Sequence, residues 1–283
     1  MISKFRAIEN MDVKELGRCG VKVPAIGMGT WGIGGYTTRD TTHDKEAIVA
    51  LRKGIELGLY LIDTAEMYGN GHCEEIVGEA IKPFPREQVF IVSKVLPEHL
   101  CYNDVIKAAR GSLKRLKTNF IDLYLIHSPN SRVPLKETMG AMEKLVGDGL
   151  VRFIGVSNFD VTEMEEARNY LSTNDIVVNQ VEYSLLERSI ERDVLPYCIK
   201  NQITVMAYTP LAKGELARNK FLREIGEKYG KNPAQVALNW LISKENVIAI
   251  PKAINLRHVE ENVGAMGWRL SKSDVESISS YFK

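Results

Sequence analysis

Four polar side chains that can hold or move a proton follow three apolar runs in the first half of the sequence. Asp63 ends the run "LYLID", Tyr68 follows in "DTAEMYG", Lys94 lies in "FIVSKV", and His127 ends "LYLIH". A buried ammonium beside a carboxylate allows both groups to stay charged, and a nearby cation lowers the pKa of a phenol from about 10. We therefore predict that Tyr68 donates a proton to a substrate carbonyl, which His127 orients through a hydrogen bond.

Each of these side chains also has a purely structural explanation as a turn, a packed aromatic, a solvated lysine or a rim histidine. Their grouping after consecutive apolar runs favours catalysis instead. A carbonyl that is protonated needs a nucleophile, and the sequence has no Ser-His-Asp arrangement that supplies one. The segment "HCEE" (72–75) fits the start of a helix, where carboxylates are favourable, better than a metal site. We expect no metal, and a hydride from a bound cofactor as the nucleophile.

The later apolar runs end in side chains suited to holding such a cofactor. Ser157, Asn158 and Gln180 offer the hydroxyl and amide groups that can bind a carboxamide. Tyr208 offers a flat face on which a nicotinamide ring can stack. Lys252 precedes a predicted helix in the region where barrels commonly bind phosphate, although a solvated surface lysine is the alternative interpretation.

The elements that must position these residues are eight short apolar runs that alternate with amphipathic helical segments. The runs are 25–31, 59–63, 89–93, 121–127, 151–157, 176–180, 203–208 and 247–251. Helical spacing lies between them, for example in 44–58, 102–116, 135–149 and 160–171. Because each run is apolar enough to be buried on both faces, the pattern predicts a closed (β/α)8 TIM barrel, with an open doubly wound sheet as the alternative. The segment 13–24 is expected to form a hairpin that covers the barrel floor.

The segment "GMGTWG" (27–32) matches the Gly-x-Gly-x-x-Gly pattern of dinucleotide-binding turns. Such a turn requires a helix to begin at the third glycine, so that phosphate meets the helix N-terminus. Here helical periodicity begins only near Asp44, after a stretch of turn-forming residues. We therefore expect no dinucleotide at this loop, and we interpret Gly27, Gly29 and Gly32 as residues that let the first strand end in a tight loop.

Composition limits the class of protein. A length of 283 residues with 45% apolar residues is typical of one α/β barrel, so we expect a single domain over 1–283. A net charge of +1 without a basic cluster argues against a nucleic-acid partner, and the lack of a long apolar run argues against a membrane partner or a signal peptide. The four cysteines form no Cys-x-x-Cys pair, which favours a cytoplasmic protein.

Seven segments, in this order, resemble the motifs of the aldo-keto reductase family: "DTAEMYG", "IVSKV", "LIHSP", "GVSNF", "NQVEY", "AYTPLAKG" and "IPKAINLRHVEEN". The resemblance runs from about Leu16 to Asn262. It implies an eight-stranded α/β barrel that reduces small aldehydes or ketones with NADPH or NADH and without a metal. The catalytic tetrad that it implies comprises Asp63, Tyr68, Lys94 and His127, with Tyr68 as the general acid.

The resemblance also implies a set of cofactor and substrate contacts. Those to the nicotinamide are Ser157, Asn158, Gln180 and Tyr208, and those over the pyrophosphate are Pro210, Leu211 and Gly214. Those to the adenosine end are Lys252, Glu261 and Asn262, with Lys252 beside the 2′-phosphate. Trp31 matches an aromatic side chain that forms a wall of the substrate pocket.

Three departures from the family pattern bear on specificity. His258 stands where many members have Arg, with Arg257 before it, and the lost bidentate charge weakens the preference for the 2′-phosphate. We therefore expect NADH as a weaker alternative to NADPH, the cofactor that Lys252 favours. Ser128 replaces an aromatic residue after the histidine of the tetrad, which predicts a wider, more polar pocket. The chain ends soon after 271–283, too early for the long loop that closes the pocket in many relatives, so we expect an open site with broad substrate selection.

Two other classes of function remain open at this stage. A non-enzymatic redox sensor would bind NADPH without consuming it, and a Schiff-base aldolase would use Lys94 as its nucleophile. The complete tetrad argues against the sensor. Asp63 argues against the aldolase, because it should keep the Lys94 amine protonated and poorly nucleophilic.

Overall fold

The computed structural model describes residues 11–283, and its centre is a sheet of eight parallel strands. The strands are β3 (Met28–Gly29), β4 (Leu61–Asp63), β5 (Phe90–Val95), β6 (Ile121–Ile126), β7 (Val151–Ser157), β8 (Ile176–Glu182), β9 (Thr204–Tyr208) and β10 (Val247–Ala249). Each lies on one of the predicted runs. Every residue of β5 and β6 is buried, because helices cover the outer face and opposing side chains fill the inside.

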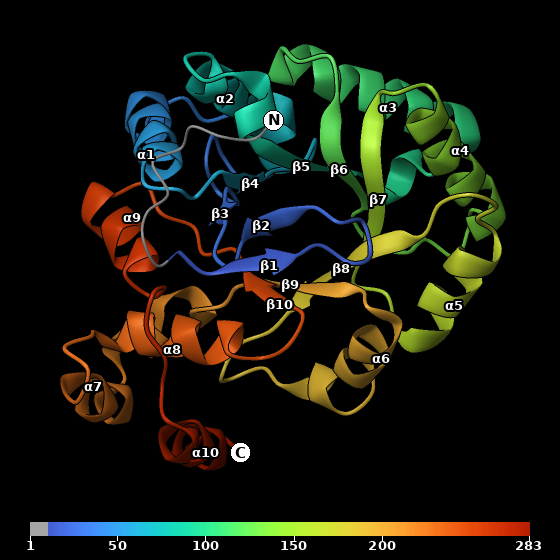
Figure 1. Ribbon diagram of the computed structural model, residues 1–283. Coiled ribbons are helices and arrows are strands. Elements are labelled where there is room, and N and C mark those ends of the chain that lie inside the picture. Colours follow the sequence, from blue (N-terminus) through green and yellow to red (C-terminus); the bar gives the residue numbers. More distant parts are fainter. Residues whose placement is uncertain (1–10) are drawn as a thin grey trace.

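The sheet closes on itself between its first and last strands. Ile26 bridges Ala249, and Gly29 bridges Lys252, both in parallel orientation. Figure 1 shows helices around the ring of strands. The predicted eight-stranded barrel is therefore confirmed, and the open doubly wound sheet is not what forms.

Helices alternate with the strands along the chain. They are α1 (Asp44–Glu56), α2 (His72–Ile81), α3 (Tyr102–Leu116), α4 (Leu135–Gly147), α5 (Val161–Asn169), α6 (Val194–Asn201), α7 (Lys220–Glu227), α8 (Pro233–Ile242), α9 (Leu256–Val263) and α10 (Lys272–Tyr281). Short 3-10 helices are η1 (Tyr68–Gly71), η2 (Arg86–Gln88), η3 (Pro97–His99), η4 (Ser189–Glu191), η5 (Ala212–Gly214) and η6 (Leu216–Arg218). Capping boxes at Asp160 and Asn232 start α5 and α8. None of the helices described is long and apolar enough to cross a bilayer.

A two-stranded hairpin covers one end of the barrel, as predicted. Its strands β1 (Val13–Glu15) and β2 (Lys22–Pro24) pair antiparallel, and Figure 1 shows them lying across the ring of strands. Leu16 packs into the cluster of apolar side chains that fills the barrel interior. The Gly17 N–H donates to the Thr204 hydroxyl at 2.8 Å, at the first residue of β9. The hairpin therefore seals the end where the parallel strands begin, and the opposite end is left as the mouth.

The glycines of "GMGTWG" have two different structural roles. Gly32 has a φ of 84°, so it permits the turn that follows β3, as expected. A Cβ at Gly27 would lie 2.5 Å from a side-chain carbon of Leu61, and one at Gly29 would lie 2.4 Å from the carbonyl oxygen of Ile250. The interpretation of all three as loop residues was therefore wrong for Gly27 and Gly29, which allow the neighbouring chain segments to approach and close the barrel.

Candidate active site

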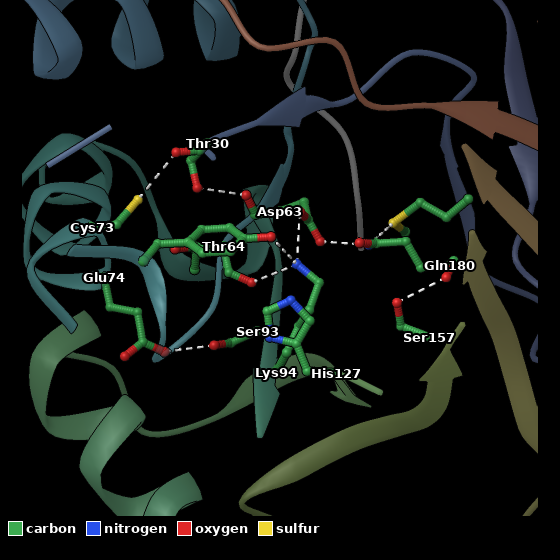
Figure 2. Close-up of polar contacts among 12 residues, drawn as sticks. Thr30, Asp63, Thr64, Cys73, Glu74, Ser93, Lys94, His127, Ser157 and Gln180 are labelled. Atoms are coloured by element: carbon green, nitrogen blue, oxygen red, sulfur yellow. Dashed lines mark hydrogen bonds and ion pairs between the residues drawn. The ribbon is translucent and has the colours of Figure 1, made fainter. Parts of the chain in front are cut away.

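The four residues of the predicted tetrad meet at the mouth of the barrel. Asp63 is the last residue of β4, Lys94 lies near the end of β5, His127 follows β6, and Tyr68 begins η1. Because the carboxyl ends of parallel strands share one edge of the sheet, these side chains converge, although His127 lies 64 positions after Asp63 in the sequence. Figure 2 shows the Lys94 nitrogen between Asp63 and Thr64, with the His127 ring beside it.

Lys94 is fully buried, and its ammonium group is completely hydrogen-bonded. Its Nζ donates to Asp63 Oδ2 at 2.8 Å, to the Thr64 carbonyl at 3.0 Å and to the Tyr68 hydroxyl at 3.1 Å. An ammonium has three protons, so each has one acceptor. Burial by itself disfavours the charge, but Asp63 and Tyr68 outweigh it and raise the pKa of Lys94. The amine therefore stays protonated.

The Tyr68 hydroxyl accepts from Lys94 and keeps its own proton for another partner. No group within residues 11–283 accepts that proton. Burial raises the pKa of Tyr68 to about 12, even though the Lys94 charge acts in the opposite direction. The expectation that Lys94 lowers the pKa of this phenol below its ordinary value was therefore wrong. Desolvation of the phenolate is the larger effect here, and it keeps the phenol protonated.

The His127 ring lies on the open side of this cluster. Its ring centroid is 5.8 Å from that of Tyr68, with the two planes steeply inclined. Burial, together with the Lys94 charge, lowers the pKa of His127 to about 3, so its imidazole is neutral near pH 7. Nδ1 is buried and has no hydrogen-bond partner within residues 11–283. A neutral imidazole can still donate one hydrogen bond from its other nitrogen.

Gln180 approaches the tetrad from the far side of the barrel. Its Nε2 donates to Asp63 Oδ1 at 2.7 Å and also lies 2.9 Å from Met206 Sδ. The Ser157 hydroxyl donates to the Gln180 backbone carbonyl at 2.8 Å. Figure 2 shows Gln180 between Asp63 and Ser157. The sequence interpretation placed Gln180 and Ser157 in the cofactor region, and the structure places Gln180 in direct contact with the tetrad as well.

Asn158 and Tyr208 form a second hydrogen-bonded group at the rim. The Tyr208 hydroxyl donates to Asn158 Oδ1 at 3.0 Å. The Asn158 amide donates to the His127 carbonyl and to the Ser128 hydroxyl, each at 3.1 Å. Asn158 has a φ of 61°, a left-handed conformation that Asn tolerates better than most residues. The predicted rim residues Asn158, Ser128 and Tyr208 therefore lie together.

The remaining predicted cofactor residues lie after β9 and β10. Leu211 and Gly214 are partly buried and Pro210 is buried, in the loop that contains η5. Lys252 and His258 are exposed, and Lys252 takes part in no ion pair with the residues that the structure describes. Glu261 lies on α9 with its Oε1 3.7 Å from Arg257 Nε, and Asn262 is buried. Within the part of the chain that the structure describes, none of these side chains forms a hydrogen bond with the tetrad, whereas Gln180 does.

Trp31 connects the loop after β3 to the tetrad. Its ring lies edge-on to Tyr68, with centroids 4.8 Å apart, and edge-on to Tyr36, with centroids 5.3 Å apart. It remains 42% exposed. A half-exposed aromatic ring beside the proton-bearing phenol is suited to contacting a substrate, and the contact of Trp31 with a substrate stays a prediction.

Sequence reasoning missed two supports of the tetrad. The Thr30 hydroxyl donates to the Asp63 carbonyl at 2.7 Å and fixes the end of β4 against β3. On the outer face of β5, the Ser93 hydroxyl donates to buried Glu74 at 2.5 Å, and Arg115 donates to the same carboxylate at 2.6 Å. Polar residues inside the apolar runs "GMGTW" and "FIVSK" were the available signal.

The "HCEE" segment begins α2, as predicted. His72 lies between two carboxylates, with Nδ1 2.8 Å from Glu75 Oε2 and Nε2 3.0 Å from Asp44. Glu75 also binds Arg39 at 2.9 Å. The two carboxylates contact opposite sides of the imidazole, so this group connects α1 with α2. The ion pair of Glu75 with Arg39 adds the loop that precedes α1.

The comparison with known proteins supports a shared fold and family. The model of the "Aldo/keto reductase family" matches residues 25–282. The methylglyoxal reductase YeaE of Escherichia coli is 43% identical over 93% of this chain and 92% of its own length. The crystal structure of the thermostable aldo-keto reductase Tm1743 with the inhibitor epalrestat is 47% identical, with a TM-score of 0.92 over 95% of this chain and 99% of that one.

A further similar solved structure is a complex with a cofactor. An aldo-keto reductase from Klebsiella pneumoniae in complex with NADPH is 38% identical, with a TM-score of 0.89 over 96% of this chain and 95% of that chain. The motif resemblance, the closed barrel and these matches agree over nearly the whole chain. The chain belongs to the aldo/keto reductase family.

Proposed function

We propose that this chain is an NADPH-dependent reductase of small aldehydes and ketones in which Tyr68 is the general acid. The observation that carries the proposal is the buried contact of Lys94 Nζ with the Tyr68 hydroxyl at 3.1 Å. In this contact the phenol accepts from Lys94 and has its own proton available for a substrate oxygen. As negative charge develops on the phenol during proton transfer, the adjacent ammonium stabilises it.

The side chains at the mouth fit the chemistry of NADPH. No group within residues 11–283 donates to the Oε1 of Gln180, so this oxygen can accept from a carboxamide. The half-buried ring of Tyr208 offers a face to the nicotinamide, and its hydroxyl is fixed by Asn158. The Lys252 ammonium takes part in no ion pair among the described residues and can bind a phosphate. When bound there, NADPH supplies the hydride that the carbonyl carbon receives.

The proposed cofactor contacts divide along the molecule. Those at the nicotinamide end are Ser157, Asn158, Gln180 and Tyr208, and those over the pyrophosphate are Pro210, Leu211 and Gly214. Those at the adenosine end are Lys252, His258, Glu261 and Asn262. Because a histidine provides less charge and fewer donors than an arginine, NADH is a weaker second cofactor in this proposal.

The proposed substrate site lies between Trp31, His127 and Ser128. The neutral His127 donates a hydrogen bond to the carbonyl oxygen and directs it toward Tyr68. The ring of Trp31 packs against the substrate, and the Ser128 hydroxyl leaves the pocket polar. Small dicarbonyl compounds are the substrate class that we propose, since relatives include a methylglyoxal reductase of Escherichia coli and a glyoxal reductase of Bacillus subtilis.

The surroundings of Lys94 favour a reductase over a Schiff-base aldolase. A Schiff base needs an amine with a free lone pair, whereas all three protons of Lys94 are hydrogen-bonded to acceptors. The four cysteines are all free thiols, which supports the proposal of a reducing, cytoplasmic location. The reaction as proposed requires no metal, because Lys94 provides the positive charge beside the proton donor.

Replacing Tyr68 by phenylalanine tests the proposal. The Tyr68→Phe variant should lose about 10²–10⁴-fold in methylglyoxal turnover, because it lacks the proton donor and retains the ring that packs against Trp31. Its Kd for NADPH, measured by quenching of NADPH fluorescence, should stay within about twofold of the wild-type value.

The control is Tyr170→Phe, which removes a hydroxyl that contacts Glu166 on α5. This variant should keep wild-type turnover. Unchanged turnover in Tyr68→Phe would exclude Tyr68 as the general acid. NADPH binding by the wild-type chain without consumption across a panel of aldehydes and ketones would favour the redox-sensor alternative.

A further inference from the structure

The hydrogen bond between Gln180 and Asp63 spans the barrel. Gln180 lies on β8 and Asp63 on β4, and three strands separate these two in the order of the sheet. In a closed ring of eight strands they are therefore on opposite sides. Both residues are only 2% exposed, and the donor and acceptor atoms are 2.7 Å apart. A short, buried hydrogen bond therefore joins two opposite strands across the mouth.

This bond completes the coordination of the Asp63 carboxylate. Oδ2 accepts from Lys94 Nζ at 2.8 Å and Oδ1 accepts from Gln180 Nε2 at 2.7 Å, so each oxygen has its own donor. Without Gln180, the buried Oδ1 would lose its partner, which is unfavourable. The carboxylate could then rotate, and both oxygens would compete for the one ammonium. Lys94 would be drawn away from the Tyr68 hydroxyl that it contacts at 3.1 Å.

The orientation of the Gln180 amide is itself fixed. Its Nε2 lies 2.9 Å from Met206 Sδ, a weak acceptor that lines the interior of the barrel. The Ser157 hydroxyl holds the backbone of the same residue at 2.8 Å. These contacts turn the amide nitrogen toward Asp63. They leave the amide oxygen on the other side of the group, where it can face a ligand.

We propose that Gln180 is a positioning residue for proton transfer, which acts by holding the Asp63 carboxylate so that Lys94 stays on the Tyr68 hydroxyl. This inference rests on the proposed function and adds to it, because a contact with the cofactor alone would not require the Asp63 bond. In this arrangement the Gln180 amide binds two groups. Its N–H donates to the Asp63 carboxylate, and its oxygen can accept a hydrogen bond from the carboxamide of the cofactor.

Two substitutions at this position separate the two halves of the amide. Gln180→Met removes both the donor and the acceptor at similar size. Gln180→Glu keeps the oxygen that faces the ligand, and its protonated carboxyl can donate to Asp63 as the amide does. Loss of that proton would leave two carboxylates side by side, which repel each other. The pair therefore keeps its shared proton up to a higher pH, and the pKa of that proton is raised. The titratable groups of this cluster are Asp63, Tyr68 on η1, Cys73 on α2, Lys94 on β5 and His127 after β6.

The turnover of the variants should therefore differ in pH dependence. With NADPH and methylglyoxal, Gln180→Met should lose about tenfold to a hundredfold in kcat at every pH. Gln180→Glu should be close to wild type at about pH 5 and fall progressively as the shared proton is lost at higher pH. The control Gln88→Glu makes the same change in η2, which precedes β5 at the end of the barrel away from the mouth, and it should keep wild-type kcat and pH profile.

The stability of the cofactor-free chain provides an independent readout. A shared proton with a raised pKa is bound more tightly in the folded than in the unfolded chain, so Gln180→Glu should lose stability as pH rises from about 4 to 8. Urea unfolding measures this, and wild type and Gln88→Glu should lack the effect. NADPH fluorescence gives the Kd of each variant separately from turnover.

Either of two results would overturn the inference. One is a Gln180→Met variant whose kcat stays within about twofold of wild type when NADPH is saturating, because Gln180 would then serve only cofactor binding. The other is a Gln180→Glu variant that parallels Gln180→Met at all pH values in turnover and in unfolding. If the wild-type chain itself does not turn over methylglyoxal, the proposed function fails, and the unfolding measurement still decides whether Gln180 positions Asp63.

Discussion

The mouth of the barrel has two sides that are built in different ways. On the side of β4 and β5, Asp63 and Lys94 are buried and all protons of the ammonium are hydrogen-bonded within the chain. On the side of β10 and α9, Lys252 and His258 are exposed, and Lys252 forms no ion pair with the residues that the structure describes. The first group is held together by hydrogen bonds within the chain itself. The second group consists of solvent-exposed side chains whose partner, in the proposed function, arrives with the cofactor.

This difference predicts how substitutions behave. A charge in the first group is needed for stability and for chemistry, because removing it leaves a buried partner unpaired. A charge on the exposed side contributes little to folding, because water solvates it in the free chain. Effects on unfolding and on cofactor binding should therefore separate between the two sides of the mouth.

The largest effect is expected at Lys94. Lys94→Met leaves the Asp63 carboxylate buried without its cation, so the free energy of unfolding should fall by about 3–5 kcal/mol. Turnover should fall by about 10²–10⁴-fold, because the ammonium beside Tyr68 is lost. Urea unfolding and NADPH consumption with methylglyoxal measure the two losses.

A second variant and a control sharpen this result. The double variant Asp63→Asn with Lys94→Met removes the uncompensated charge, so much of the stability should return while turnover stays low. Lys107→Met, on the exposed face of α3, should change the unfolding free energy by less than about 0.5 kcal/mol. If Lys94→Met is as stable as Lys107→Met, the buried pair does not stabilise this side of the mouth.

An intermediate effect is expected at Lys252, on the exposed side. Lys252→Met should raise the Kd for NADPH about tenfold, because in the proposed function this substitution removes a charged partner of the 2′-phosphate. Its free energy of unfolding should stay within about 0.5 kcal/mol of wild type. Fluorescence titration with NADPH and NADH measures the preference. Equal losses for both cofactors would contradict the assignment of Lys252 to the 2′-phosphate, because NADH lacks that group.

The sequence predicted the fold and the place of the tetrad, for a physical reason. Strands buried on both faces are continuous apolar runs, and the carboxyl ends of parallel strands share one edge, so residues such as Asp63 and His127 could be placed together from local patterns. The alternation of side chains along β5 also separates Ser93, which contacts Glu74 outside the barrel, from Lys94 inside it.

The sequence did not predict contacts that depend on distance across the barrel. Gln180 and Asp63 are separated by 117 positions, and their bond depends on the diameter of the ring and on two side-chain conformations. The roles of Gly27 and Gly29 likewise follow from close approach of Leu61 and Ile250, and not from turn propensity. Local patterns contain no information about these distances.

The pKa of Tyr68 is a third case, because two opposing effects had to be compared. From the sequence, the charge of Lys94 was expected to lower this pKa, whereas in the structure burial raises it to about 12. Burial and the charge of Lys94 lower the pKa of His127 to about 3. A phenol donates a proton only while it is protonated. A raised pKa of Tyr68 therefore moves the loss of activity to higher pH, and a lowered pKa of Tyr68 would move that loss toward neutral pH.

The smallest effect is therefore expected from pH itself. With saturating NADPH, the kcat/KM for methylglyoxal should change by less than about threefold between about pH 5 and 10, because neither Tyr68 nor His127 titrates in that range. Deuterated NADPH should give an isotope effect at each pH, which checks that hydride transfer is being measured. A decline with a midpoint below about pH 9 would mean that Lys94 outweighs burial once the mouth holds its cofactor. Because the tetrad lies on the buried side of the mouth, such a decline would show that cofactor binding at the exposed side lowers the pKa of Tyr68 on the buried side.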